Sequence, residues 1–391
     1  MTLSQVLNTF FYLLIYPYAI SVLGINEFGL FIFSSTICLY FMIFVAYGFD
    51  IHAAKIVSKN KTDQHAHGDL LNLVTFSKLA LAAISFIIFF SGVHLIQFMR
   101  DHSDLLWICF VNIITSIFLP TWYFHGMQKM RVVTIVQLFF KIVSLPCIYY
   151  FVKDEGDLTS YAAIIVGANV LSAITLFVFA TRIISPTFHW PHWKNIFQIL
   201  SDVKPMFLAS ATNTLKQKSI EIIIGTFFGM REVAIYDLAN KIYSVPSLLV
   251  SNINSALFPT LVNSTKKNII KKIIKAEIFL AFACIAFVAI FGHWAVGLVA
   301  DGQLKQAYPL SVLLSLNILT ILIVGGHIYF TFIPSGRYDL ILRNQVVSLA
   351  IFFISCAIYL SIDKSIYAVV LALSTSALFE IAYIFFLKRK L

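Results

Sequence analysis

Charged and amide side chains occur inside two apolar stretches in the second half of the chain, at about 205–228 and 234–258. At 100° per residue, one face of a helix over the first stretch holds Ser210, Asn213, Thr214, Gln217, Lys218 and Glu221. A second stripe, with Lys241 at its edge, consists of Asp237, Asn240, Ser244, Ser247, Ser251 and Ser255. A helix facing lipid would not have such a stripe, so both stripes must face protein or a water-filled cavity.

Lysines make this region costly to bury in a membrane. Each lysine at mid-helix costs about 2.5–3.5 kcal/mol on insertion scales. Lys218 and Glu221 are three residues apart and Asp237 and Lys241 four apart, so each pair can partly neutralise itself. Lys216 has no such partner on its own helix. Two interpretations remain open: a cavity that binds a polar ligand, or hydrogen bonding between helices that is purely structural.

Other polar groups within apolar stretches are less specific. Gln5, Asn8, Tyr12 and Tyr16 form one face of the first helix, a combination that suits sugars because aromatic rings cover sugar faces while amides and hydroxyls bond to hydroxyl groups. Tyrosine near a helix end is also a common interface anchor. For Lys78, Lys141 and Glu380, the alternative to a function is snorkelling to the membrane surface or a misplaced span boundary.

The elements that position these residues follow from composition. Hydrophobic residues make up 60% of the 391 residues and charged residues 12%, against about half and a quarter in soluble proteins. The apolar runs are continuous and roughly 20 residues long, which predicts helices that cross a ~30 Å hydrocarbon core. We therefore predict an all-α membrane protein with about twelve transmembrane helices: 4–23, 28–49, 70–92, 105–124, 133–152, 160–181, 205–228, 234–258, 278–300, 308–333, 345–361 and 366–387.

Basic residues predict the orientation of these helices. With the N-terminus in the cytoplasm, 18 of the 28 Lys and Arg fall in cytoplasmic segments, and five fall on the other side: Arg100, Lys153, Arg231, Lys305 and Lys364. This asymmetry fits the positive-inside rule, so both termini are expected in the cytoplasm. The net charge of +10 is thus a topology signal and does not indicate nucleic-acid binding.

A repeat divides the chain into two lobes. The segment from Gly24 to Phe31 after the first helix and the segment from Gly229 to Tyr236 after the seventh share the pattern Gly-x-x-Glu-apolar-small-apolar-aromatic. We predict two pseudo-symmetric six-helix lobes, 1–181 and 205–391, joined by a cytoplasmic linker over 182–204. Transporters with such repeats commonly bind substrate between them.

Enzymatic machinery is missing from the sequence. No Gly-x-x-x-x-Gly-Lys-Ser/Thr motif indicates an ATPase, and no His, Cys and carboxylate cluster has metal spacing. The five cysteines share no motif spacing and read as small apolar residues in helices. The loops outside the membrane are too short for a glycosyltransferase or polymerase site, so we expect no enzyme activity, metal or cofactor.

Several motifs, in this order, resemble a known family: Tyr16-Pro-Tyr-Ala-Ile-Ser-Val-Leu-Gly24, Glu27-Phe-Gly-Leu-Phe31, Tyr47-Gly-Phe-Asp50, Leu119-Pro-Thr-Trp-Tyr-Phe-His-Gly-Met-Gln-Lys-Met-Arg131, Tyr236-x-x-Ala-x-Lys241 and Phe258-Pro259. The chain is similar to the Wzx-type O-antigen flippases of the polysaccharide-export branch of the MATE-like transporter superfamily. That family usually has a short basic segment before the first helix, whereas this chain begins almost inside it.

The resemblance implies a V-shaped pair of six-helix bundles in a bacterial inner membrane. It implies that a polyprenyl-pyrophosphate-linked oligosaccharide is moved from the cytoplasmic to the outer leaflet, with a polysaccharide polymerase and assembly proteins as partners. In that setting Lys216, Lys218 and Lys241 would hold the pyrophosphate in a cationic central cavity, because lysine is a point-charge phosphate binder. The sugar would meet Asn8, Tyr12, Asn213, Gln217, Asn240 and Ser244.

The resemblance also suggests coupling to inward H⁺ or Na⁺, for which Glu221 and Asp237 are the candidates.

Three alternative functions stay open. A multidrug exporter of the same superfamily would need acidic residues for cationic drugs. A glycan polymerase would need a convergent set of carboxylates and arginines. A non-transporting scaffold would leave the buried lysines without a purpose.

Overall fold

Helices are the regular elements throughout the part of the chain described by the computed structural model, which comprises residues 2–59, 61–186, 189–261, 267–300, 304–333, 335 and 337–389. The first, α1, runs from Thr2 to Ala46 and is interrupted at Gly24, whose φ of 76° is a conformation that favours glycine. A straight helix of that length would measure about 68 Å, twice the hydrocarbon thickness. Gly24 thus separates the two helices predicted at 4–23 and 28–49.

The contacts divide the chain into two compact units, which we describe separately. Unit 2 comprises Val22–Ala211. After α1 it contains α2 (Phe49–Lys59), α3 (Gln64–Leu95), α4 (Gln97–Asp101), α5 (Ser103–Val111), α6 (Ile113–Phe118), α7 (Thr121–Gly126), α8 (Met130–Phe151), the turn η1 (Glu155–Asp157) and α9 (Leu158–Ile184). The predicted span at 105–124 is therefore a broken helix made of α5, α6 and α7.

The motif from Leu119 to Gly126 has a packing role in unit 2. Trp122 on α7 is fully buried, and a Cβ at Gly126 would lie 2.7 Å from the Val57 Cβ and 2.9 Å from the carbonyl oxygen of Ala54. The helices α7 and α2 approach each other closely there, and only glycine leaves enough room.

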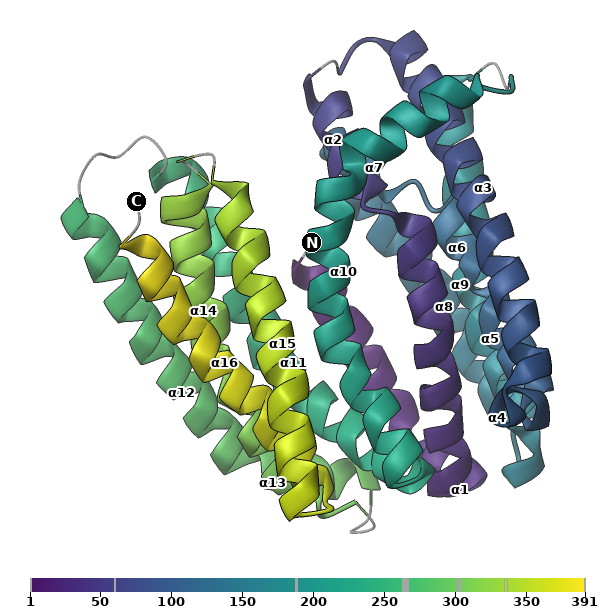
Figure 1. Ribbon diagram of the computed structural model, residues 1–391. Helices are drawn as coiled ribbons and strands as arrows, with labels where there is room; N and C mark the ends of the chain where they lie inside the picture. The colour runs from purple at the N-terminus through teal and green to yellow at the C-terminus, as the bar shows by residue number, and fades with distance from the viewer. Residues whose placement is uncertain are drawn as a thin grey trace. The chain divides into compact units, whose positions relative to one another are not determined.

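Unit 1 comprises Met1–Ser21 and Thr212–Leu391. It contains the second part of α10 (Trp193–Phe227), then α11 (Met230–Leu261), α12 (Lys267–Ala300), α13 (Ala307–Ser315), α14 (Asn317–His327), the π-helical turn η2 (Ile328–Phe332), α15 (Tyr338–Ile362) and α16 (Ile366–Lys388). The last two pack side by side (Figure 1). The lobes predicted at 1–181 and 205–391 stay a prediction; the contacts place residues 1–21 with the second half of the chain.

The exterior of these helices is apolar, as expected of a multi-pass membrane protein. Among the described residues, nine helical segments are long and apolar enough to cross a membrane, judged by length and composition. On α12, Phe279, Phe282 and Ile290 are more than half exposed, an arrangement that water would disfavour. The polar side chains of α10 and α11 keep both helices out of this set of nine, and the total of twelve crossings stays a prediction.

The predicted orientation can be tested on two exposed lysines in described turns, Lys61 between α2 and α3 and Lys364 between α15 and α16. We expect a membrane-impermeant thiol reagent applied to intact cells to label Lys364→Cys and not Lys61→Cys. The protein without either substitution corrects for its own cysteines. Labelling of Lys61→Cys from outside would contradict cytoplasmic termini.

Candidate functional site

A cavity of about 450 Å³ lies inside unit 1. Residues of α10, α11, α13, α14, η2 and α16 line it, and many of them are polar. The polar lining consists of Asn213, Lys216, Gln217, Lys218, Glu221, Tyr236, Asn240, Tyr243, Ser247, Asn317, Thr320 and Glu380. The polar face predicted for the seventh helix therefore faces a cavity, and two residues of the α11 stripe, Asn240 and Ser247, join it.

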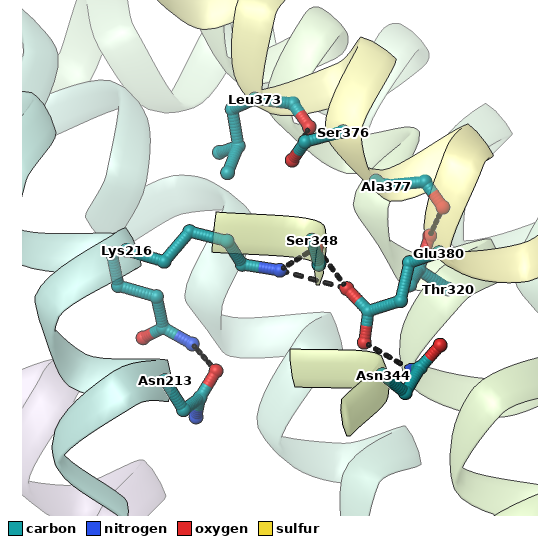
Figure 2. Close-up of polar contacts among 10 residues, drawn as sticks. Asn213, Lys216, Thr320, Asn344, Ser348, Leu373, Ser376, Ala377 and Glu380 are labelled. Atoms are coloured by element: carbon teal, nitrogen blue, oxygen red, sulfur yellow. Dashed lines mark hydrogen bonds and ion pairs between the residues drawn. The ribbon is translucent and has the colours of Figure 1, made fainter. Parts of the chain in front are cut away.

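Lys216 forms an ion pair with Glu380, which lies in the second half of α16. The Lys216 Nζ is 2.7 Å from the Glu380 Oε2 and also donates to the Ser348 Oγ at 2.9 Å (Figure 2). Ser348 Oγ in turn donates to the same Glu380 oxygen at 2.8 Å, and Asn344 Nδ2 donates to the Glu380 Oε1 at 3.3 Å. We call these four residues the Glu380 cluster. Its carboxylate thus accepts three hydrogen bonds, one from a charged donor, which makes the contact a strong one.

Local structure explains why these groups meet. Asn344 and Ser348 are four residues apart, so both lie on one face of α15. The short connection from Asp363 to Ser365, where Ser365 caps the N-terminus of α16, brings α16 back alongside α15, with Glu380 facing that pair. Lys216 reaches the cluster from α10, on the face that also holds Asn213, which accepts a hydrogen bond from Gln217 at 3.4 Å.

A second ion pair in the cavity is local to α10. The Lys218 Nζ is 2.6 Å from the Glu221 Oε1, and Glu221 is fully buried while Lys218 is 28% exposed. The structure therefore contains the pair that the spacing of three residues predicts. The charged residues of the described lining are these two lysines and two glutamates, so the formal charge around this part of the cavity is balanced.

A third group joins the first part of α1 to α11. The hydroxyl of Tyr16, which is buried, donates to the Asp237 Oδ2 at 2.7 Å and contacts the carbonyl oxygen of Ala234 at 3.4 Å. The Asp237 Oδ1 lies 3.7 Å from the Lys241 Nζ. This confirms the predicted pairing of Asp237 with Lys241, and the Tyr16 hydroxyl donates to the same carboxylate.

The structure brings some of the predicted site residues to the cavity and not others. Those that line it are Asn213, Lys216, Gln217, Lys218, Glu221 and Asn240. Asp237, Lys241 and Ser244 do not, and the Ser244 Oγ donates to the carbonyl oxygen of Lys241 one turn earlier. The side chains of Asn8 and Tyr12 lie outside those that the structure describes. A cavity between the lobes stays a prediction.

Sequence reasoning missed Ser348 and Asn344, and it noted Glu380 within a span without assigning it to the site or naming its partner. A signal for Glu380 was present, because a carboxylate inside an apolar span requires a partner and Lys216 was the lysine of the polar stripes without one on its own helix. No comparable signal pointed to Ser348 and Asn344, since serine and asparagine are common in membrane helices.

Lys78 in unit 2 does not snorkel. Its side chain is only 2% exposed, and the Nζ is 3.7 Å from the Oδ1 of Asp50, near the start of α2. This contact joins α3 to α2 and fits a structural role.

The chain is similar to known proteins over most of its length. The polysaccharide biosynthesis protein family matches residues 1–265. A protein of Escherichia coli (strain K12) named "Putative O-antigen transporter" is 25% identical over 267 residues, which are 67% of this chain and 63% of that protein. A protein of the same name from Shigella dysenteriae is 23% identical over 263 residues, 65% of this chain and 64% of that one. The chain thus spans less than two thirds of the length of these relatives.

Solved structures show the same fold at low sequence identity. An inward-facing multidrug resistance MATE family transporter of the MOP superfamily superimposes with a TM-score of 0.69 at 12% identity, covering 96% of this chain and 93% of that one. A MOP superfamily transporter from Pyrococcus furiosus gives 0.62 at 14% identity, covering all of this chain and 93% of that one. The chain therefore belongs to the polysaccharide biosynthesis protein family, and it has the MATE-like fold of the MOP superfamily.

Proposed function

We propose that this protein is a transporter, and not an enzyme, that moves a lipid-linked oligosaccharide from the cytoplasmic to the outer leaflet of a bacterial inner membrane. The observation that supports this most is the polar cavity of unit 1, in which Lys216 and Lys218, each paired with a glutamate, lie among amide and hydroxyl groups. The family match and the transporter names of two relatives agree with it.

The physical problem posed by such a substrate matches the cavity. A sugar head group that enters hydrocarbon loses its hydrogen bonds to water, at a cost of several kcal/mol for each unsatisfied group. Amides and hydroxyls such as those of Asn213, Gln217, Asn240 and Thr320 replace these bonds, while the lipid tail stays in the bilayer. A pyrophosphate that links sugar to lipid would contact the lysines as point charges.

The direction of movement has an electrical source. A membrane potential that is negative inside drives an anion outward with about 2.3 kcal/mol per charge per 100 mV.

Coupling to inward H⁺ or Na⁺ through Glu221 or Asp237 remains part of the proposal, as do alternating access and interaction with a polysaccharide polymerase or assembly proteins. A multidrug exporter is the second candidate because of the shared fold, and the balanced charge of the described lining favours neither an anion nor a cation.

Deletion of the gene tests the proposal. We expect lipid-linked glycan to accumulate in the inner leaflet and surface polysaccharide to fall strongly, because a charged or sugar-bearing head group crosses hydrocarbon only at a high cost in lost hydrogen bonds. Re-expression of the intact chain should restore both. Normal glycan in the outer leaflet together with increased sensitivity to cationic drugs would contradict the proposal and favour the multidrug exporter.

A further inference from the structure

Lys216 is already engaged by protein groups in this structure. Two contacts of its ammonium group are short, to the Glu380 carboxylate and the Ser348 hydroxyl, and its side chain is only 13% exposed. An anion that binds Lys216 must therefore exchange with Glu380 or join a site that holds a carboxylate at 2.7 Å. Two anionic groups around one ammonium repel each other, which favours exchange.

The Glu380 carboxylate keeps hydrogen-bond partners when Lys216 moves away. When the ammonium leaves, Glu380 keeps the hydrogen bonds donated by Ser348 at 2.8 Å and by Asn344 at 3.3 Å. Both donors lie on α15, which packs along α16 (Figure 1). The carboxylate thus has two neutral donors in place without Lys216, and these lower the cost of leaving a buried charge.

The other ion pair of the cavity lies within a single helix. Lys218 and Glu221 belong to the same helix, three residues apart, so their contact does not depend on any packing between helices. Lys216 and Glu380 belong to α10 and α16, and α10 is the helix through which the chain passes from unit 2 into unit 1, at Ala211 and Thr212. Lys216 lies about one turn beyond that point.

We propose that Glu380, held by Ser348 and Asn344, is an internal competitor for Lys216, and that Lys216 alternates between this carboxylate and the pyrophosphate of a lipid head group. Glu380 is a positioning residue in this scheme: it lowers the affinity of Lys216 for the anion and promotes release after transport. The inference rests on the proposed function for the identity of the anion. No covalent bond is made or broken, because one ion pair replaces another.

Competition has a quantitative signature. A site that is partly occupied by an internal anion shows an apparent Kd raised by the inverse of the free fraction. Removing the competitor therefore tightens binding, whereas removing a true ligand weakens it. This opposite sign separates a competing Glu380 from one that merely holds the fold together.

The test is pyrophosphate binding by the purified full-length protein, measured by titration calorimetry with inorganic pyrophosphate and with farnesyl pyrophosphate. We expect Glu380→Gln to bind both at least about tenfold more tightly than the unsubstituted protein, which is the usual effect of one charged hydrogen bond. Ser348→Ala, which weakens the hold on Lys216 without removing a charge, should give a smaller gain. The double substitution Glu380→Gln with Lys216→Gln should lose the gain.

A matched control is available on α12. Glu277 is a buried carboxylate of unit 1 that does not line the cavity, so Glu277→Gln makes the same chemical change outside the site and should leave the Kd unchanged. Thermal unfolding of each variant shows whether it is folded, and Ser348→Ala replaces Glu380→Gln if the latter is not.

Three results would overturn the inference: no tightening in Glu380→Gln and Ser348→Ala, the same tightening in Glu277→Gln, or a gain that persists without Lys216. Binding of inorganic but not farnesyl pyrophosphate would overturn the assignment to a lipid head group. These outcomes are distinct from failure of the proposed function, because a deletion strain with normal lipid-linked glycan would refute transport whatever the binding data show.

Discussion

Lys216→Ala is expected to abolish most of the transport, at least about tenfold, while Lys216→Arg retains much of it. Both outcomes follow if the charge of Lys216 acts on the pyrophosphate, since a charged hydrogen bond contributes roughly 1.5–3 kcal/mol and arginine keeps the charge. The measurement is surface polysaccharide in a deletion strain, with membrane abundance determined in parallel. Lys364→Ala, in the exposed turn before α16, serves as the control for loss of a positive charge.

The structure adds a stability effect that must be separated from transport. Lys216→Ala leaves Glu380, which is 10% exposed, without its cation. Breaking a buried pair on one side costs about 3–5 kcal/mol, and the hydrogen bonds that Ser348 and Asn344 still donate should keep the loss at or below the low end of this range. Combining Lys216→Ala with Glu380→Gln removes both charges and should restore the free energy of unfolding. It should not restore transport. Full transport by Lys216→Ala or by the double variant would mean that Lys216 has no role in substrate binding.

The positions of the helices could largely be predicted from the sequence, because the apolar runs have the length that a bilayer requires. The predicted spans at 133–152, 160–181 and 366–387 match α8, α9 and α16 to within a few residues. The join between the first two spans was less predictable, since Gly24 interrupts a helix that continues on both sides. Periodicity does not distinguish such an interruption from a loop.

The site was predictable to the extent that each contact is local. The pairs Lys218–Glu221 and Asp237–Lys241 follow from spacings along one helix. The contact of Lys216 with Glu380 spans 164 positions in the chain, and that of Tyr16 with Asp237 spans 221. Pairings across helices depend on how the helices pack, which no single helix encodes. The sequence does show which charges lie within apolar spans. Because each of them would be costly if unpaired, partners can be expected, but the sequence does not identify them.

For Lys241, the sequence and the structure indicate different roles. The sequence predicts that Lys241 binds the pyrophosphate. In the structure its ammonium group lies 3.7 Å from Asp237, and Lys241 is not among the residues that line the cavity of unit 1. Asp237 also accepts a hydrogen bond from Tyr16 at 2.7 Å. The three residues thus form a group that holds the first part of α1 against α11.

We therefore expect that Asp237→Asn combined with Lys241→Gln recovers both stability and most of the transport lost in the single variants. Lys241→Gln alone should be the more destabilising, by about 1–3 kcal/mol, because it leaves a buried carboxylate with fewer partners. Asp237→Asn alone should cost less, since Lys241 is 29% exposed and reaches water. In the double variant the new amide oxygen at position 237 still accepts from Tyr16, so Tyr16→Phe should remove the recovery.

Thermal unfolding of the purified variants and surface polysaccharide in the deletion strain measure the two effects independently. A double variant that is as stable as the unsubstituted protein but inactive would place Lys241 on the substrate, as the sequence predicts, and would extend the anion site beyond the cavity of unit 1. Recovery of both properties would restrict the charge that acts on the pyrophosphate to Lys216 and Lys218. The exchange of Lys216 between Glu380 and the substrate would then govern binding, because the Lys218–Glu221 pair is internal to one helix.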